Sequence, residues 1–142
     1  MKRVLVDTDI CLDLLTGREP HVELAVRLFG ALSAEGSTVC VSVASLLDLH
    51  YFLKKTLGEQ ATRSALDRFR TEVEVLPVGE KAFVAALRSP VADFEDAVQV
   101  ETAKVAKVDL ILTRNIKDYK RSSVRALRPE DYLGARRPPF ST

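Results

Sequence analysis

The amino-acid sequence predicts an α/β protein with a mainly parallel central sheet that is covered by helices on both faces. Apolar segments of strand length alternate with segments of helical periodicity along the chain, as in folds built from strand–helix–strand units. The strand segments are almost continuously apolar, which is typical of parallel strands buried on both faces. No repeat or linker divides the 142 residues, so we expect one domain over residues 1–134 and a flexible tail at residues 135–142.

Two strands and four helices are expected in the first half of the chain. The segments RVLV and TVCVS are apolar and rich in β-branched residues, as buried strands are. Asp9 is the expected N-cap of a helix that runs to Leu15 and is stopped by the segment TGREP. The predicted strands are residues 3–6 and 38–42, and the predicted helices are residues 9–15, 22–36, 43–58 and 59–70.

Three strands and three helices are expected in the second half. Pro77 closes the segment VEVLPV, and Pro90 separates two segments of helical spacing. Pro129 suits the first position of a last short helix, where its missing N–H group costs no hydrogen bond. The predicted strands are residues 73–78, 109–113 and 123–127, and the predicted helices are residues 79–88, 93–108 and 129–134.

The composition is that of an ordinary globular protein. The hydrophobic fraction is 46% and the charged fraction is 29%, and no apolar run is long enough to span a membrane. The N-terminal segment MKRVLVDTD becomes acidic too early for a signal peptide, so we expect a cytoplasmic protein. Cys11 and Cys40 lie in apolar segments and match no zinc spacing, so we expect both to be buried.

The charged residues are unevenly distributed, although the formal net charge is only +1. From Lys104 to the end, the chain has ten Lys or Arg residues and four Asp or Glu residues. A basic segment of this kind suits phosphate binding and suits a solvated surface equally well. The composition therefore leaves both interpretations open.

Polar side chains follow two of the predicted strands, at the point where each strand ends. Asp7 follows the first strand, and the segment ILTRNIKD carries Thr113, Asn115 and Asp118. In open α/β sheets, binding sites form beyond the carboxyl ends of strands at a topological switch point. We therefore expect these two strand ends to share one crevice.

Two more acids lie on apolar faces of predicted helices. Asp48 shares its face with alanine and aromatic residues, and Asp96 shares its stripe with Val100 and Ala103. Asp96 also suits the negative charge that favours a helix N-terminus, although Asp93 is the better cap there. A structural partner for Asp48, such as Lys54 or Lys55, lies toward the C-terminal end of the helix and is expected to miss it.

Carboxylates that are gathered in a protein interior need compensation. An unpaired buried charge costs several kcal/mol, and neighbouring carboxylates repel and raise at least one pKa. A divalent cation removes both penalties, and Mg²⁺ prefers carboxylate and water oxygens. The residues alone leave two interpretations open, namely metal-dependent phosphate chemistry and scattered structural acids.

The order of these acids resembles the PIN-domain family, and especially the VapC-like toxins of toxin–antitoxin pairs. The matching segments are VLVDTDICLDLL, SVASLLDLHYFLKK, DFEDAVQVETAKVAKVDLILTRNIKDYK and RALRPEDYL. They occur in the order of the family and cover nearly the whole chain. The third segment is the most specific, because an acidic helix start, a strand and a TRNxKD motif rarely follow one another by chance.

The resemblance implies a three-layer α/β/α domain and an endoribonuclease that depends on Mg²⁺ or Mn²⁺. By resemblance, the catalytic and metal-binding acids are Asp7, Asp48, Asp96 and Asp118. Thr113 and Asn115 match residues that support this site, and Asp9 falls where Asn is frequent. Asp48 falls where the family usually has Glu, so the resemblance leaves open whether it binds metal directly or through a water.

Partners also follow from the resemblance. It implies an RNA substrate, a cognate antitoxin protein and a homodimer, with no membrane association. The basic residues expected to approach the RNA backbone are Arg114, Lys117, Lys120 and Arg121. Phosphate contacts of this kind position an RNA and do not specify its sequence.

Two other functions compete with the nuclease. A PIN fold that serves only as a scaffold or partner-binding module is one, although such domains usually lose acids that this chain retains. A haloacid-dehalogenase-type phosphatase is the other, because VLVDTD matches its DxD signature and Ser42 matches a required hydroxyl. That mechanism also needs an acidic pair after a strand, and the segment RSPVA before Asp93 does not resemble a strand end.

Overall fold

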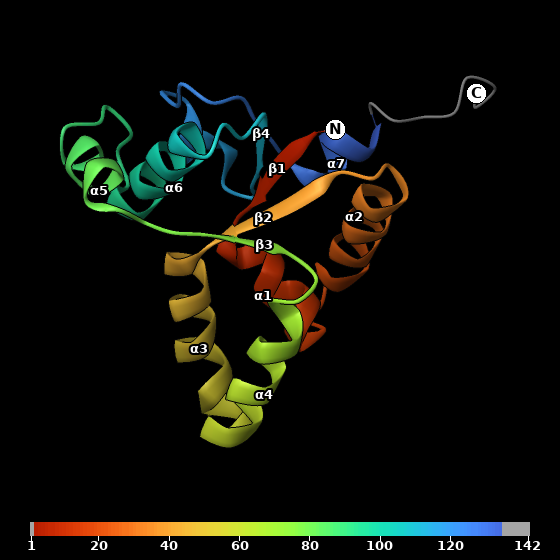
Figure 1. The fold of residues 1–142 in the computed structure, drawn as a ribbon. Helices are drawn as coiled ribbons and strands as arrows, with labels where there is room; N and C mark the ends of the chain where they lie inside the picture. The colour runs from red at the N-terminus through yellow and green to blue at the C-terminus, as the bar shows by residue number, and fades with distance from the viewer. Residues whose placement is uncertain (1, 135–142) are drawn as a thin grey trace.

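Five parallel strands form the central sheet of the structure, a computed structural model that describes residues 2–134 (Figure 1). Every neighbouring pair is parallel, which confirms the predicted mainly parallel sheet. The strands lie in the order β3-β2-β1-β4-β5. They are β1 (Arg3–Val6), β2 (Thr38–Ser42), β3 (Glu74–Leu76), β4 (Leu110–Leu112) and β5 (Ala126–Leu127).

The first strand lies at the centre of the sheet. β1 pairs with β2 on one side and with β4 on the other, so the winding of the chain reverses at β1. The carboxyl ends of β1 and β4 are therefore adjacent at the topological switch point, where ligands bind in folds of this kind. A hydrogen bond from the Asp7 N–H group to the Leu112 carbonyl, 2.9 Å long, joins the two ends.

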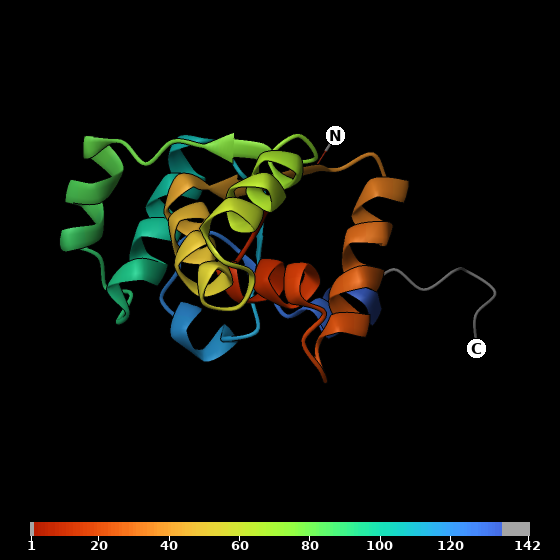
Figure 2. The same cartoon turned by 90° about the horizontal axis from the view of Figure 1, so that it is seen from below.

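Helices cover both faces of the sheet and make three layers (Figures 1 and 2). One face carries residues of α1, α2, α3, α4 and α7 in its core, and the other carries residues of α5 and α6. The three-layer α/β/α arrangement implied by the resemblance is confirmed. The helices are α1 (Thr8–Thr16), α2 (Val22–Ala34), α3 (Val43–Leu57), α4 (Glu59–Phe69), α5 (Glu80–Leu87), α6 (Phe94–Val105), the 3₁₀ helix η1 (Ile116–Tyr119) and α7 (Pro129–Gly134).

Alternate residues of the central strands enter the two opposite cores. In β1, Val4 and Val6 lie in the core beneath α1 and α2, whereas Leu5 lies in the core beneath α6. In β4, Leu112 and Ile111 divide between the two cores in the same way. Because side chains alternate along a strand, both faces of these strands are buried, which explains their continuous apolar sequence.

The start of α1 corrects the sequence prediction. Asp7, and not Asp9, is the N-cap: the helix begins at Thr8, and the Asp7 side chain accepts a hydrogen bond from the Thr8 N–H group. The chain passes from β1 directly into α1, so the first residue after the strand takes the capping position. The prediction that Asp93 caps α6 is confirmed, because its side chain accepts from the Asp96 N–H group.

The two edge strands are shorter than predicted. β3 has three residues and β5 has two, although longer apolar segments were expected at residues 73–78 and 123–127. Each pairs on one side only, and short edge strands leave few unpaired backbone groups. The 3₁₀ helix η1, at residues 116–119, was not predicted.

Two further expectations concern burial and the chain ends. Cys11 and Cys40 are buried free thiols, as predicted. In the stretch from residue 2 to residue 134, no helix is both long and apolar enough to cross a bilayer. The expected flexible tail at residues 135–142 lies outside the described residues, and the single-domain boundary at residue 134 stays a prediction.

Candidate active site

A cavity of about 440 Å³ opens at the carboxyl edge of the sheet. Its volume falls in the usual range for ligand-binding sites, roughly 300–1,000 Å³. The predicted quartet of Asp7, Asp48, Asp96 and Asp118 lines it. Asp7 caps α1, and the other three residues lie on α3, α6 and η1. The acidic side chains around it are Asp7, Asp9, Asp48, Asp93, Glu95, Asp96 and Asp118.

Asp7 is the buried centre of the site, with 7% of its surface exposed. Its Oδ1 atom accepts hydrogen bonds from the Thr8 N–H group at 2.8 Å and from Gln99 Nε2 at 3.2 Å. Its Oδ2 atom accepts from Thr113 Oγ1 at 2.9 Å and from the Tyr119 hydroxyl at 3.3 Å. Burial raises the pKa of Asp7, and the bonds from Thr113, Thr8 and Gln99 oppose that rise.

Gln99 connects Asp7 to the second strand and its helix. Its amide nitrogen donates to Asp7 and also to Ser45 Oγ at 3.0 Å, while its Oε1 atom accepts from Ser42 Oγ at 2.6 Å. Ser42 caps α3 and Ser45 lies in its first turn, so this buried amide joins α6, α3 and the end of β1. Every hydrogen-bonding atom of the Gln99 side chain therefore has a partner in the site.

Tyr119 lies between two of the predicted metal-site acids. Its hydroxyl is 3.3 Å from Asp7 Oδ2 and 3.1 Å from Asp96 Oδ1. Burial, together with the two carboxylates, raises the pKa of Tyr119 far above its ordinary value, so the hydroxyl keeps its proton. Burial and repulsion from Asp7, Asp93 and Asp118 raise the pKa of Asp96 to about 7, although the Tyr119 hydroxyl opposes the rise.

Asp48 faces an acid that the sequence analysis did not single out. Burial raises the pKa of Asp48, and a hydrogen bond between the Asp48 and Glu95 carboxyl groups opposes that rise. The pKa of Glu95 is raised by burial and by its neighbours Asp48 and Asp93. Lys54 and Lys55 lie over aromatic rings of their own helix, which agrees with the expectation that they miss Asp48.

Burial of the quartet is less complete than the helical patterns predicted. Asp48, Asp96 and Asp118 are partly exposed, and Asp7 is the one fully buried member. Tyr51 and Phe52, expected on the same face as Asp48, are exposed, and Phe52 also lines the cavity. The helical period places residues on one face, but it does not tell which part of that face the neighbouring elements cover.

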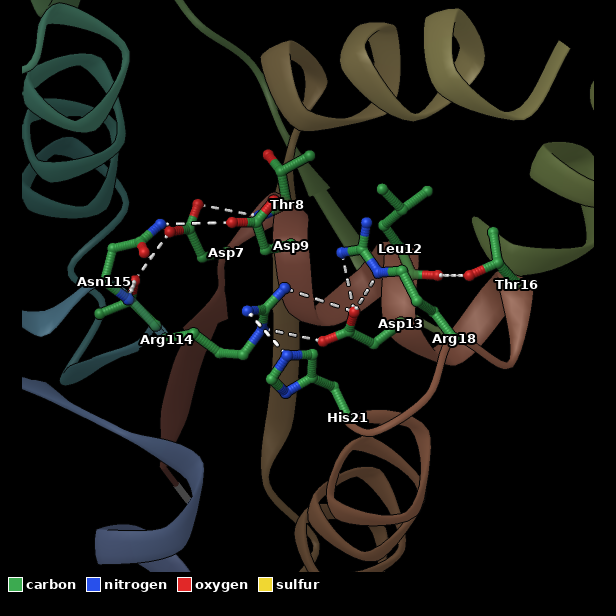
Figure 3. Close-up of polar contacts among 11 residues, drawn as sticks. Asp7, Thr8, Asp9, Leu12, Asp13, Thr16, Arg18, His21, Arg114 and Asn115 are labelled. Carbon is green, nitrogen blue, oxygen red and sulfur yellow. Dashed lines mark hydrogen bonds and ion pairs between the residues drawn. The ribbon is translucent and has the colours of Figure 1, made fainter. Parts of the chain in front are cut away.

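The loop after β4 is attached to α1 at two successive turns (Figure 3). Asn115 donates to Asp9 Oδ2 at 3.2 Å. One turn later on α1, the buried Asp13 accepts from Arg114 Nε at 3.0 Å and also pairs with Arg18 at 2.8 Å. Asp13 is only 1% exposed, and the two guanidinium groups supply the charge that its burial requires.

The predicted RNA-contacting residues divide into two groups. Arg114 directs its guanidinium to Asp13 and His21 and does not line the cavity (Figure 3). Lys117 lies on η1, and Lys120 and Arg121 follow it directly, all three exposed beside Asp118 in the chain. The structure thus places three of the four cations in one exposed segment, and their contact with RNA stays a prediction.

Sequence reasoning missed the residues that hold the acids in place. Gln99 follows Asp96 by three residues, so helical spacing could have placed it on the same face. Tyr119 directly follows Asp118 at the end of the segment TRNIKD, and no local pattern indicates that its hydroxyl reaches Asp7. Asp13 stands in the opening acidic segment, but its two arginine partners are 5 and 101 residues away along the chain.

The donor set suits a hard divalent cation, but it is not assembled as a metal site. Carboxylate oxygens are the ligands that Mg²⁺ prefers, and so many acids around one cavity would repel a phosphodiester unless cations intervened. Within residues 2–134, no group of three or more His, Cys, Asp or Glu side chains is arranged to hold a metal ion.

The fold and site define a three-layer α/β/α protein with an acidic cavity at the switch point of a parallel sheet. The family model described as PIN domain matches residues 3–117, and the chain belongs to this family. The recognised family resemblance is thereby confirmed. No curated protein sequence matches the chain significantly.

Solved structures of similar fold cover most of the chain. VapBC2 from Rickettsia felis, bound to a promoter DNA fragment, is 19% identical with a TM-score of 0.70, covering 89% of this chain and 98% of that chain. A toxin–antitoxin complex from Klebsiella pneumoniae is 26% identical with a TM-score of 0.67, covering 89% and 97%. VapC20 from Mycobacterium tuberculosis, a sarcin–ricin loop cleaving toxin, is 20% identical with a TM-score of 0.65, covering 86% and 98%.

Replacing Gln99 should destabilise the metal-free protein, because the change leaves buried polar groups without partners. We expect Gln99→Leu to lower the free energy of unfolding by about 1–3 kcal/mol, the usual cost of an unsatisfied buried group. Urea unfolding in EDTA measures the change. Gln60→Leu, at an exposed position of α4, is the matched control and should have little effect. Equal losses in the two variants would contradict the structural role of Gln99.

Proposed function

We propose that this chain is a divalent-cation-dependent endoribonuclease and the toxin member of a toxin–antitoxin pair. The observation that carries the proposal is the meeting of Asp7, Asp48, Asp96 and Asp118 in one cavity of a PIN domain. RNA as the substrate is supported by the similar fold of VapC20, described as a toxin that cleaves the sarcin–ricin loop. The expected cytoplasmic location stays a prediction.

The proposed cation is Mg²⁺ or Mn²⁺. Asp7, Asp96 and Asp118 would hold it, with Asp48 binding directly or through a water. When bound, the cation supplies Lewis acidity, which lowers the pKa of water and offsets charge on the phosphate oxygens. Hard carboxylate oxygens and the repulsion among the cavity acids support this choice.

The side chains of this protein orient the acids and exchange a proton. Thr113 and Gln99 hold the two oxygens of Asp7 in a fixed orientation at the end of β1. Asp96, with its pKa raised to about 7, exchanges a proton near neutral pH in the cation-free site. Because a cation favours the ionised carboxylate, its binding releases that proton, so the affinity for metal should increase with pH.

The proposed protein partners are a cognate antitoxin and a second copy of this chain. The antitoxin proposal is supported by similarity to toxin–antitoxin complexes, including the one from Klebsiella pneumoniae. The homodimer proposal is supported by apolar side chains that the single chain leaves exposed on α3 and α5, since exposed apolar surface often marks interfaces. These are Val43, Leu47, Tyr51 and Phe52 of α3, and Phe83 and Leu87 of α5.

The two competing functions differ in what supports them. A phosphatase would need an acidic pair after a strand, but Asp93 and Asp96 begin α6 after a loop from α5. A non-catalytic scaffold would not need the acids together, so their shared cavity favours the nuclease. Metal-dependent cleavage of RNA by the pure protein separates the nuclease from both.

The central experiment is an RNA cleavage assay with purified protein in Mg²⁺, in Mn²⁺ and in EDTA. Wild-type protein should cleave with either cation and not in EDTA. Asp96→Asn should reduce the rate by more than about 100-fold, the upper range for loss of an outer-sphere partner of a metal. Asp67→Asn is the matched control, because Asp67 is exposed on α4 and does not line the cavity.

We also expect the Asp96→Asn variant to change how the free energy of unfolding depends on pH in the absence of metal. The pKa of Asp96 in the folded protein, about 7, exceeds the ordinary aspartate value of 3.8. The unfolded chain therefore releases this proton first, and the stability of the folded protein falls as the pH rises between these two values. Asn removes that loss. Urea unfolding in EDTA should therefore show a smaller decrease from pH 5 to pH 8 in the variant. In the cleavage assay, an Asp96→Asn variant that cleaves RNA at the wild-type rate would show that Asp96 is not a metal-site residue.

Substitutions of Asp48 test whether its carboxylate contributes to activity and whether the longer Glu side chain can replace it. We expect Asp48→Glu to retain activity, because the additional methylene restores the reach of the Glu that the family usually has. Asp48→Ala should lose most of the activity, since it removes the carboxylate from the cavity. Initial cleavage rates measure both. Wild-type activity in Asp48→Ala would place this residue outside the metal site.

Lys117 on η1 and Lys120 directly after it are exposed, so we expect them to contribute to a salt-dependent affinity for RNA. Changing Lys117 and Lys120 together to Ala should weaken the binding of unrelated RNAs alike and flatten the slope of log K against log salt by about 0.7 per lost contact. The measurement uses an inactive Asp7→Asn background. Arg27→Ala with Arg68→Ala, exposed on helices that do not line the cavity, is the control. Superimposable slopes would mean that the lysines only solvate the loop.

A further inference from the structure

Four hydrogen-bonding groups of the protein surround the Asp7 carboxylate. A carboxylate offers about four lone-pair sites, two on each oxygen. Oδ1 accepts from the Thr8 N–H group and from Gln99, and Oδ2 accepts from Thr113 and from the Tyr119 hydroxyl. Three of these sites are held by the Thr8, Gln99 and Thr113 donors, and the Tyr119 hydroxyl lies at the fourth, where it shares its one proton between Asp7 and Asp96. A cation that binds Asp7 at this fourth site must displace the hydroxyl.

The Tyr119 hydroxyl is the donor that is most easily displaced. Its distance to Asp7, 3.3 Å, is the longest of the four, and the Thr8 N–H group and Thr113 bind at 2.8 and 2.9 Å. Gln99, at 3.2 Å, is fixed by further bonds to Ser42 and Ser45. The hydroxyl has a single proton for two carboxylates, because it also lies 3.1 Å from Asp96.

The position of this hydroxyl matters because it joins two of the proposed metal-binding acids. Tyr119 is buried, with 4% of its surface exposed, and it ends the short η1 helix directly after Asp118. A hydrogen-bond donor between Asp7 and Asp96 reduces their repulsion when no cation is present. The same position places the hydroxyl between Oδ2 of Asp7 and Oδ1 of Asp96, where a common ion would otherwise lie.

We propose that Tyr119 is a positioning residue that bridges Asp7 and Asp96 in the cation-free protein and leaves Asp7 when a divalent cation binds. The inference rests on the proposed function, because it assumes that the acidic cavity binds such a cation. Tyr119 thereby stabilises the empty site and competes with the metal. Removal of the Tyr119 hydroxyl should therefore lower the folding stability of the cation-free protein. The same change should raise the affinity of the protein for the cation.

The experiment compares wild type with Tyr119→Phe, which removes only the hydroxyl. Calorimetric titration with Mn²⁺ alone should show binding about three- to tenfold tighter in the variant, the equivalent of one net hydrogen bond. Its melting temperature in EDTA should be lower than that of wild type. Tyr132→Phe is the matched control, because that buried hydroxyl donates to Glu35, which does not line the cavity. It should lower stability and leave the Mn²⁺ affinity unchanged.

A second measurement follows the hydroxyl directly. The chain has three tyrosines and no tryptophan, so Tyr51→Phe with Tyr132→Phe leaves Tyr119 as the one tyrosine. Saturating Mg²⁺ should then change the near-ultraviolet circular dichroism of Tyr119, because its hydrogen bond to Asp7 is lost. Titration of an Asp7→Asn version supplies the control, in which Mg²⁺ should leave the signal unchanged.

The outcomes separate this inference from the proposed function. Wild type that binds Mn²⁺, together with Tyr119→Phe that binds it equally or more weakly, overturns the inference and leaves the proposed function standing. A Tyr119 signal that does not respond to saturating Mg²⁺ also overturns it. Wild type that binds no Mn²⁺ overturns both. Tighter binding in Tyr119→Phe, with lower stability in EDTA and an unchanged Tyr132→Phe control, supports the inference.

Discussion

The burial of one carboxylate, that of Asp7, is the constraint on which the rest of the site depends. A buried carboxylate without partners is unstable, so each of its oxygens must accept hydrogen bonds from the surrounding protein. The four donors come from the start of α1, from α6, from the end of β4 and from η1. Because these elements are far apart in sequence, Asp7 can be satisfied only when the whole carboxyl edge of the sheet is assembled.

The parallel sheet supplies the geometry for this assembly. β1 lies between β2 and β4, and the polar residues that follow each strand are therefore brought to one edge. Ser42 at the end of β2 reaches Asp7 through Gln99, whereas Thr113 after β4 reaches it directly. The charge that gathers at this edge is opposed to stability, as the raised pKa of Asp96 indicates. The acids gathered at this edge therefore cost stability in the empty protein, as expected for the proposed cation site.

Much of the fold follows from local sequence, but the partners of the acids do not. Continuous apolar segments predicted β1, β2 and β4, and helical spacing predicted the seven α-helices within residues 2–134. The N-cap of α1 was assigned to Asp9 because a cap and a strand end look alike in sequence, and only the direct passage from β1 selects Asp7. Gln99 and Tyr119 acquire their roles from residues 92 and 112 positions away, contacts that no local pattern encodes.

The double attachment of the β4 loop to α1 limits how the site can move. Asn115 is held by Asp9 and Arg114 by Asp13, so two consecutive residues of the loop are fastened to two consecutive turns of one helix. A displacement of η1 that keeps these contacts must begin after Asn115, where Asp118 and Tyr119 follow in one short turn. A change in the position of Asp118 is thereby coupled to the contacts of the Tyr119 hydroxyl with Asp7 and Asp96.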